Sequence, residues 1–138
     1  MSFEITKSAD GEQVEITLSI PAAEADAIGE ELSSLVNWMD TALWALGLLR
    51  TGSTHRPDGA AQPVTVDHLY TVINDLEKRL APRLQGIQAA AIREHAALGG
   101  SYGQLALAMD TPRSTAQRRR DAVTDNPATT WERWARGY

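Results

Sequence analysis

The sequence predicts a mainly α-helical protein with an N-terminal β-hairpin, two long helices and a pair of short helices near the C-terminus. Apolar residues alternate over residues 3–20, then recur at steps of three and four over 23–50 and again from residue 66. Breaks at Gly99-Gly100 and at 110–112 delimit the two short helices. With 138 residues, 43% of them hydrophobic, the chain can bury one core and carry a small appendage.

The predicted hairpin places its apolar side chains on one face, with Asp10-Gly11 as the turn. These apolar residues are Phe3, Ile5, Val14, Ile16, Leu18 and Ile20. Pro21 ends the second strand. Two strands alone are marginally stable in water, so this face is expected to cover a helix or to pair with a second copy.

The first long helix is expected over Ala23–Arg50. Its main apolar stripe comprises Ile28, Leu32, Leu35, Met39, Leu43 and Leu46. A second apolar strip, formed by Trp38, Trp44 and Leu48, lies outside that stripe. It indicates either a core packed on two sides of the helix or a dimer seam.

Residues 51–63 are rich in glycine, proline and serine, and are expected to form a loop. The second long helix is expected from Val66, with an apolar stripe formed by Leu69, Ile73, Leu76 and Leu80. Pro82 removes a helical hydrogen bond, so we expect a kink there or a new helix that begins at Ala81 or Pro82. That helix should run to about Leu98.

The C-terminal segment contains Thr129 three residues before Glu132, which is the spacing of a capping box. A short helix should follow, with Trp131, Trp134 and Tyr138 on one face. These aromatic residues are expected either to pack against the domain or to contact a partner.

Charge is divided unevenly along the chain. Residues 1–77 carry three basic and thirteen acidic side chains, a net charge of −10, whereas residues 78–138 carry ten basic and five acidic ones, a net charge of +5. This polarity is typical of a chain with one end facing a polyanion, although surface charge can also vary by chance.

Several classes of function find no support in the sequence. There is no cysteine, no apolar run of about 18 residues and no basic N-terminal leader pattern, so we expect a soluble cytoplasmic protein that does not enter a membrane. His55, His68 and His95 lack the spacing of metal ligands. Because no nucleophile–base pair or phosphate loop is present, we expect neither enzyme activity, nor a cofactor, nor a metal.

The segment "SYGQLALAMDTPRSTAQRRRD", residues 101–121, carries the clearest functional signal. Ser101 is expected to cap a short helix whose Leu105, Ala106 and Met109 face inward. Asp110 and Thr111 form the turn, and a second helix is expected over Pro112–Val123, with Thr111 as its cap.

On this second helix, Ala116 is expected to face inward. Helical geometry directs Ser114, Gln117, Arg118 and Asp121 outward, with Arg113 between the two faces and Arg119 and Arg120 at the packed flank. Arginine pairs with guanine and glutamine with adenine, which makes Arg113, Gln117 and Arg118 candidate base readers, with Ser114 a weaker one. The candidate phosphate contacts are Arg119, Arg120 and, at the amide-rich start of the preceding helix, Ser101, Tyr102 and Gln104.

The stretch Leu80–Arg120, "LAPRLQGIQAAAIREHAALGGSYGQLALAMDTPRSTAQRRR", resembles the helix-turn-helix of small bacterial DNA-binding proteins. Ala106 matches the small residue that lets the first two helices approach, and Ala116 matches the inward position of the recognition helix. The chain departs from the family pattern in the turn, where Asp110 replaces the usual glycine and Thr111-Pro112 replaces the usual Val-Ser. The resemblance implies a C-terminal helix-turn-helix fold that binds DNA.

The predicted organisation is therefore a hairpin and helical dimerisation region over residues 1–80, followed by a helix-turn-helix DNA-binding domain with a short aromatic helix over 81–138. The predicted function is sequence-specific binding of double-stranded DNA by a homodimer, as a transcriptional regulator. The alternative is an interaction adaptor that keeps the helix-turn-helix fold and binds a protein partner through its acidic N-terminal half. For residues 113–121 themselves, the alternative to DNA binding is a solvated arginine-rich helix in a bundle or a helix that contacts an acidic protein.

Overall fold

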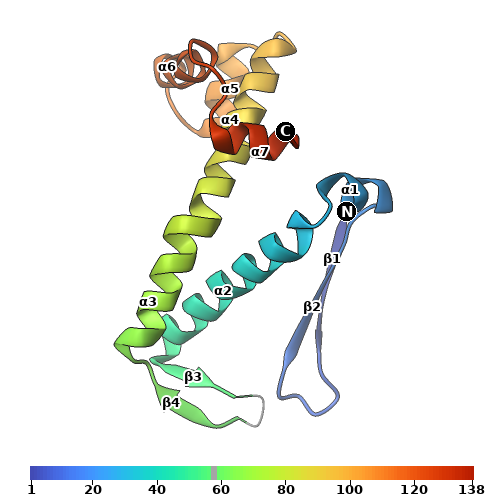
Figure 1. The fold of residues 1–138 in the computed structure, drawn as a ribbon, viewed down its shortest axis with the longest axis vertical. Helices are drawn as coiled ribbons and strands as arrows, with labels where there is room; N and C mark the ends of the chain where they lie inside the picture. Colours follow the sequence, from blue (N-terminus) through green and yellow to red (C-terminus); the bar gives the residue numbers. More distant parts are fainter. Residues whose placement is uncertain (57–58) are drawn as a thin grey trace. The chain divides into compact units, whose positions relative to one another are not determined.

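The computed structural model describes residues 1–56 and 59–138, and the chain divides into two compact units, Met1–Leu80 and Ala81–Tyr138. The protein is mainly helical, with a two-stranded hairpin at its N-terminus, as the sequence predicts (Figure 1).

The hairpin joins β1 (Ser2–Lys7) to β2 (Val14–Ser19) in antiparallel register. Phe3 lies opposite Leu18, and Ile5 lies opposite Ile16, which places the alternating apolar side chains on one face. Asp10 organises the turn, since its carboxylate accepts hydrogen bonds from the Ser8 hydroxyl and the Glu12 amide. Every residue of both strands is exposed, and within residues 1–56 and 59–138 no Cα atom of either strand lies within 8 Å of a helical Cα atom.

The expected helix over Ala23–Arg50 is two helices, α1 (Ala22–Ile28) and α2 (Glu31–Thr51). Gly29 separates them because its backbone φ of 68° lies outside the right-handed helical region. The prediction that Ile28 belongs to the apolar stripe was therefore wrong, because Ile28 lies before the break and is exposed.

The face of α2 that packs within the chain is not the predicted main stripe. Ala45 and Leu48 are buried with Val72 of the next helix, and the ring of Trp38 lies under the Arg79 guanidinium at 5.8 Å. Trp38 and Leu48 of the second strip are thus buried within this unit, whereas Trp44, the third member, is 37% exposed. The exposed members of the predicted stripe on α2 are Met39, Leu43 and Leu46.

Residues 51–63 are more ordered than the expected loop. β3 (Ser53–His55) pairs with β4 (Ala61–Pro63), with Thr54 opposite Gln62. Gly52 ends α2 in a left-handed conformation and starts this second hairpin. The part of the predicted loop at 57–58 lies outside the described residues.

Helix α3 (Val66–Asp75) begins at a capping box, in which Thr65 accepts from the His68 amide and the His68 imidazole accepts from the Thr65 amide. A π-helical turn, η1 (Leu76–Leu80), follows α3, and α4 (Ala81–Ala97) starts where a new helix was expected. Pro82 lacks an amide hydrogen, and a π turn accommodates such an interruption of the hydrogen-bond ladder. Ile73, predicted to face the core, is exposed, and Val72 is buried instead.

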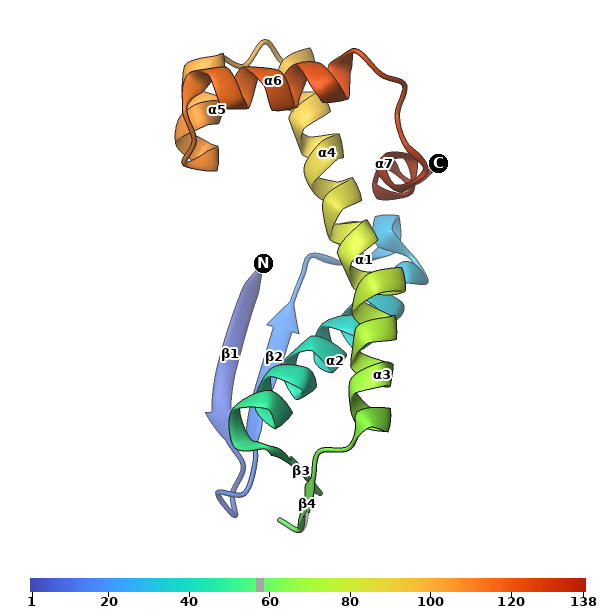
Figure 2. The ribbon, with the colours of Figure 1, turned by 90° about the vertical axis from the view of Figure 1, so that its left-hand side faces the viewer.

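The C-terminal unit consists of α4, α5 (Tyr102–Met109), α6 (Arg113–Thr124) and α7 (Thr130–Arg136). In Figure 2, α6 crosses α4, while α7 packs along the opposite side of α4 from α5. The predicted capping box of Thr129 and Glu132 is confirmed. Trp131 and Trp134 pack edge to face, with the Arg83 guanidinium over both rings. Tyr138 does not join them, since it is 82% exposed beyond the left-handed Gly137.

Helices α4 and α7 pack closely against each other at Gly86. A Cβ atom there would lie 2.5 Å from the carbonyl oxygen of Trp131, so Gly86→Ala should force the helices apart and lower the free energy of unfolding by about 1–3 kcal/mol. Gly103→Ala is the matched control, because a Cβ on that helical glycine meets nothing within 4 Å and should leave stability unchanged or raise it by up to ~1 kcal/mol. Tryptophan-detected melts compare the two variants, and equal stability would contradict this packing.

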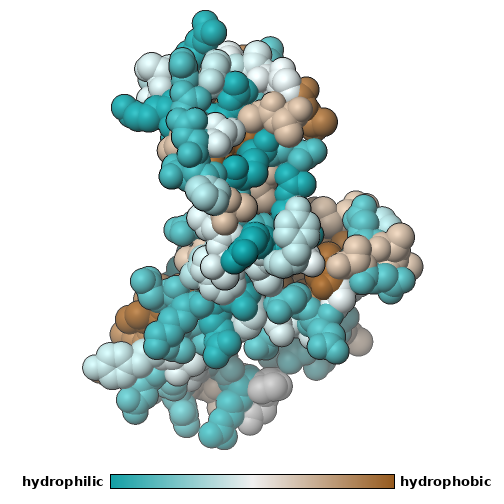
Figure 3. Space-filling model, turned by 45° about the horizontal axis from the view of Figure 1, so that its top comes forward, coloured by the Kyte–Doolittle hydropathy of each residue, from teal (hydrophilic) through white to brown (hydrophobic). Residues whose placement is uncertain are grey.

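Apolar side chains are not confined to these cores. Figure 3 shows hydrophobic residues reaching the surface in several places, and large exposed apolar residues occur on both the hairpin and α2. Single exposed apolar residues are ordinary, whereas contiguous ones indicate a surface that another molecule covers.

Candidate nucleic-acid interface

Helices α5 and α6 pack through small and apolar side chains. Leu105 and Ala106 of α5 are buried against Ala116, which has no exposed surface, and Met109 packs on this cluster. Ser101 caps α5 as predicted, since its hydroxyl oxygen accepts a hydrogen bond from the Gln104 amide at 3.1 Å. The inward positions expected for both helices are thus confirmed.

The turn between α5 and α6 depends on Asp110, which is the one non-glycine residue with positive φ among the described residues. At φ 50° and ψ 49° it ends α5, and the Thr111 amide donates back to the Ala106 carbonyl at 3.0 Å. This pairing satisfies a free carbonyl at the end of the helix.

The start of α6 differs from the expectation. Pro112, rather than Thr111, is the residue that precedes the helix, and its carbonyl accepts from the Thr115 and Ala116 amides. The Thr111 hydroxyl makes no cap and no other hydrogen bond within the described part of the chain. The helix therefore spans Arg113–Thr124, one residue later at each end than the predicted Pro112–Val123.

One surface of α6 carries exposed polar side chains, and we call it the α6 face. It consists of Arg113, Ser114, Gln117 and Arg118. Arg113 lies one turn from Gln117, and Ser114 lies one turn from Arg118. None of these four makes a side-chain hydrogen bond or ion pair within residues 1–56 and 59–138, whereas Arg119 reaches Gln88 at 3.5 Å. The α6 face thus presents guanidinium and amide groups to solvent.

Arg120 and Tyr102 lie beside this face and contact each other. The Arg120 guanidinium lies 3.8 Å from the centre of the Tyr102 ring and donates to the Gly100 carbonyl. The Tyr102 hydroxyl donates to the Asp121 carboxylate at 2.9 Å. Asp121, expected to point outward, is half-buried because of this contact. These side chains fix the start of α5 against α6.

The start of α5 also carries Ser101 and Gln104, both predicted to contact phosphate. Both are exposed. The Ser101 hydroxyl oxygen is used by the cap, which leaves its proton to donate. The Gln104 side chain has no hydrogen-bond partner in the part of the chain described.

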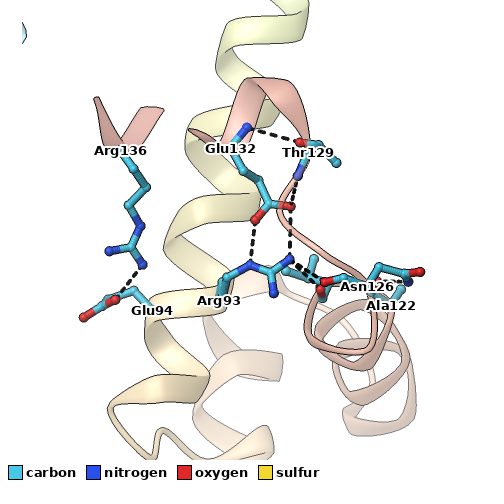
Figure 4. Close-up of polar contacts among 8 residues, drawn as sticks. Arg93, Glu94, Ala122, Asn126, Thr129, Glu132 and Arg136 are labelled. Atoms are coloured by element: carbon cyan, nitrogen blue, oxygen red, sulfur yellow. Dashed lines mark hydrogen bonds and ion pairs between the residues drawn. The ribbon is translucent and has the colours of Figure 1, made fainter. Parts of the chain in front are cut away.

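Sequence reasoning missed the residue that fixes the other end of α6. Arg93 of α4 donates to the Glu132 carboxylate at 2.7 Å, to the Val123 carbonyl at 2.7 Å and to the Asn126 carbonyl at 3.0 Å (Figure 4). It thereby joins α4, the last turn of α6 and α7. A cation at the C-terminal end of a helix also interacts favourably with the helix dipole.

Glu132 is 3% exposed and charged. The hydrogen bond from Arg93 lowers the pKa of the Glu132 carboxyl, and this effect outweighs burial, which acts in the opposite direction. The Thr129 amide also donates to this carboxylate. A second ion pair, between Arg136 and Glu94 at 2.6 Å, joins the same two helices at the surface (Figure 4).

Charge differs between the two units. Residues 81–138 contain eight arginines and five acidic residues, a net charge of +3, whereas residues 1–80 contain five basic and thirteen acidic residues, a net charge of −8. Three of the five acidic residues in the C-terminal unit have side-chain partners. Glu94 and Glu132 form ion pairs with arginines, and Asp121 accepts a hydrogen bond from Tyr102.

Comparison with known protein families, with characterised proteins and with solved structures found no match for this chain. Among the described residues, no three histidine, cysteine or acidic side chains are grouped so that they could hold a metal ion. No described helix combines the length and apolar character needed to span a bilayer. A function for this chain must therefore be argued from its geometry and charge.

Proposed function

We propose that the C-terminal unit is a helix-turn-helix domain that binds double-stranded DNA by placing the α6 face in the major groove. The observation that carries this proposal is the exposure of Arg113, Gln117 and Arg118 on one surface of a helix whose opposite side is anchored by the fully buried Ala116. An α-helix fits the major groove, where arginine pairs with guanine and glutamine with adenine.

The proposed base readers have no intramolecular partners among the described residues, and this supports their assignment to DNA binding. Arg113, Gln117 and Arg118 have no hydrogen bond or ion pair within the described residues, so binding a base does not require them to leave an existing contact. The acidic residue of α6, Asp121, lies on the same side of the helix as Ser114 and Gln117, and its half-buried carboxylate accepts a hydrogen bond from the Tyr102 hydroxyl. That hydrogen bond holds the carboxylate against the start of α5, and Arg113, Gln117 and Arg118 remain exposed for contact with bases.

Phosphate contacts come from the flanks of this surface in the proposed complex. Arg119 is exposed on the flank of α6 next to α4, and its contact with Gln88 at 3.5 Å is long enough to be exchanged for a phosphate. Ser101 and Gln104 offer side-chain donors at the amide-rich start of α5. Arg120 and Tyr102 serve instead to position α5, because both already have partners.

We further propose that two copies bind together, as a transcriptional regulator in the cytoplasm. One such domain makes few base contacts, and specificity within a genome normally requires two. Two-fold symmetry would place the recognition helices about 10 bp apart on an inverted repeat.

The second candidate function is an interaction adaptor. It is favoured by the net charge of −8 on residues 1–80 and by the exposed apolar residues of the hairpin. An adaptor of this kind would bind a basic or apolar protein partner and would have no measurable preference for DNA.

Salt dependence separates the two candidates. Binding of the full chain to mixed-sequence duplex DNA is expected to weaken by roughly a thousandfold between about 50 and 200 mM salt, as counterions return to the phosphates. Fluorescence anisotropy of a labelled duplex measures this. Absence of DNA binding at the lower salt concentration would contradict the proposal and favour the adaptor.

A further inference from the structure

An open apolar groove lies between β2 and α2 in the N-terminal unit. Its lining is apolar except for Asp40, and it includes Ile16, Leu18, Met39 and Leu43. The cavity volume is about 500 Å³. We call this feature the hairpin groove.

The chain itself does not fill the hairpin groove. The strands make no close backbone approach to any described helix, since no Cα atom of β1 or β2 lies within 8 Å of a Cα atom in one of them. Ile16 is 58% exposed and Leu43 is 57% exposed, although they face the same groove. Both apolar walls are therefore left in water, where a two-stranded sheet is marginally stable.

The apolar area at this face matches what a stable dimer buries. Eight large apolar side chains of the hairpin and α2 are about half exposed or more: Phe3, Ile5, Val14, Ile16, Leu18, Val36, Met39 and Leu43. Together they leave on the order of 800 Å² in water, which is about what each partner buries in a standard interface. A face of this size exceeds the largest apolar patches of ordinary monomers.

We propose that the hairpin groove is the dimer interface of this protein and that its occupant is the hairpin and α2 of a second copy. The inference rests on the homodimer of the proposed function and names its surface, but its test needs no DNA. The second strip cannot form the dimer seam as a whole, because its Trp38 and Leu48 are buried within the chain. In a two-fold arrangement, the apolar face of each copy covers the apolar face of the other, and the free strand edges can pair.

Charge distinguishes this occupant from a basic protein partner. Residues 1–80 carry a net charge of −8, so two copies repel each other at long range and associate through apolar contact. Salt screens that repulsion and should leave the dimer unchanged or tighten it. A dimer that dissociates as salt rises would overturn the proposal.

Two variants on the same helix test the surface. Light scattering of the full chain at micromolar concentration should give twice the 15.0 kDa chain mass. Leu43→Lys should raise the dimer dissociation constant by about tenfold or more, whereas Leu49→Lys, at a site that is 65% exposed and outside the groove, should leave it unchanged. Lysine lowers the negative charge, so weakening cannot come from added repulsion. A monomeric parent, or equal effects of the two variants, would overturn the proposal.

A second measurement applies if Leu43→Lys does not fold. The chain has no cysteine, so Leu43→Cys and Leu49→Cys each provide a single reactive thiol. In the dimer, Cys at position 43 should react several-fold more slowly with a maleimide than Cys at position 49, and dilution below the dissociation constant should remove the difference. Equal rates in a protein of dimeric mass would show that the dimer forms elsewhere, while the proposed homodimer itself would stand. A monomeric mass would mean that another partner occupies the groove. It would contradict both the proposed interface and the proposed homodimer.

Discussion

Replacing Arg113, Gln117 and Arg118 together by alanine is expected to abolish specific DNA binding while leaving the protein folded. Each side chain should contribute about 1–3 kcal/mol if it contacts a base edge, so each single variant should bind its site roughly 5- to 150-fold more weakly. Stability should change little, because all three side chains are exposed and have no partners within the described residues. Anisotropy titration with specific and scrambled duplexes measures the loss.

Arg119→Ala is the matched control for these variants. It lies on the same helix, at the flank next to α4, and is assigned to phosphate, so its loss should weaken binding to both duplexes alike and should reduce the salt dependence. If the triple variant bound every duplex as tightly as the parent, the α6 face would not be the DNA-binding surface.

Removing Arg93 is expected to have the largest effect on stability. Arg93→Ala leaves the Glu132 carboxylate, 3% exposed, without its cation, and removes the donor from the Val123 and Asn126 carbonyls. The expected loss is about 2–4 kcal/mol in the free energy of unfolding. Arg136→Ala is the control, because it removes an exposed ion pair between the same two helices and should change stability little. Denaturant unfolding measures the stability of both variants. A similar loss of unfolding free energy in the two would contradict the assigned role of Arg93.

The same ion pair predicts a pH dependence with a defined sign. Because Arg93 lowers the pKa of Glu132 in the folded protein, the pair stabilises the fold above the ordinary glutamate value of 4.5, and this stabilisation is lost as pH falls through the lower folded pKa. Glu132→Gln should therefore destabilise the protein at neutral pH, and the difference from the parent should shrink below about pH 4.5. A difference that stays constant with pH would contradict the ion pair.

Local sequence signals predicted much of the secondary structure. The alternation of the hairpin, the caps at Ser101 and Thr129 and the turn at Asp110 follow from the spacing and conformational preferences of neighbouring residues. The break at Gly29 was missed because the apolar stripe appeared to continue through it. Thr111 was misassigned as a cap because Pro112 was placed inside α6 rather than before it.

Features that depend on contacts with residues far away in the sequence could not be predicted from these local signals. Helix α2 has two apolar strips, and only the position of α3 determines that Leu48 is buried and Leu43 is not. The π turn at Leu76–Leu80 interrupts the regular helical repeat, and Ile73 just before it lies outside the core. Arg93 contacts residues 30 to 39 positions away, and no local pattern marks that contact.

Selection of bound fragments from random duplex DNA tests the central claim most directly. The full chain should enrich an inverted repeat whose half-sites are centred about 10 bp, or a multiple of it, apart. The variant with alanine at Arg113, Gln117 and Arg118 should enrich no motif from the same pool. If the parent enriched no sequence, or if the variant enriched the same one, recognition of DNA by the α6 face would be contradicted.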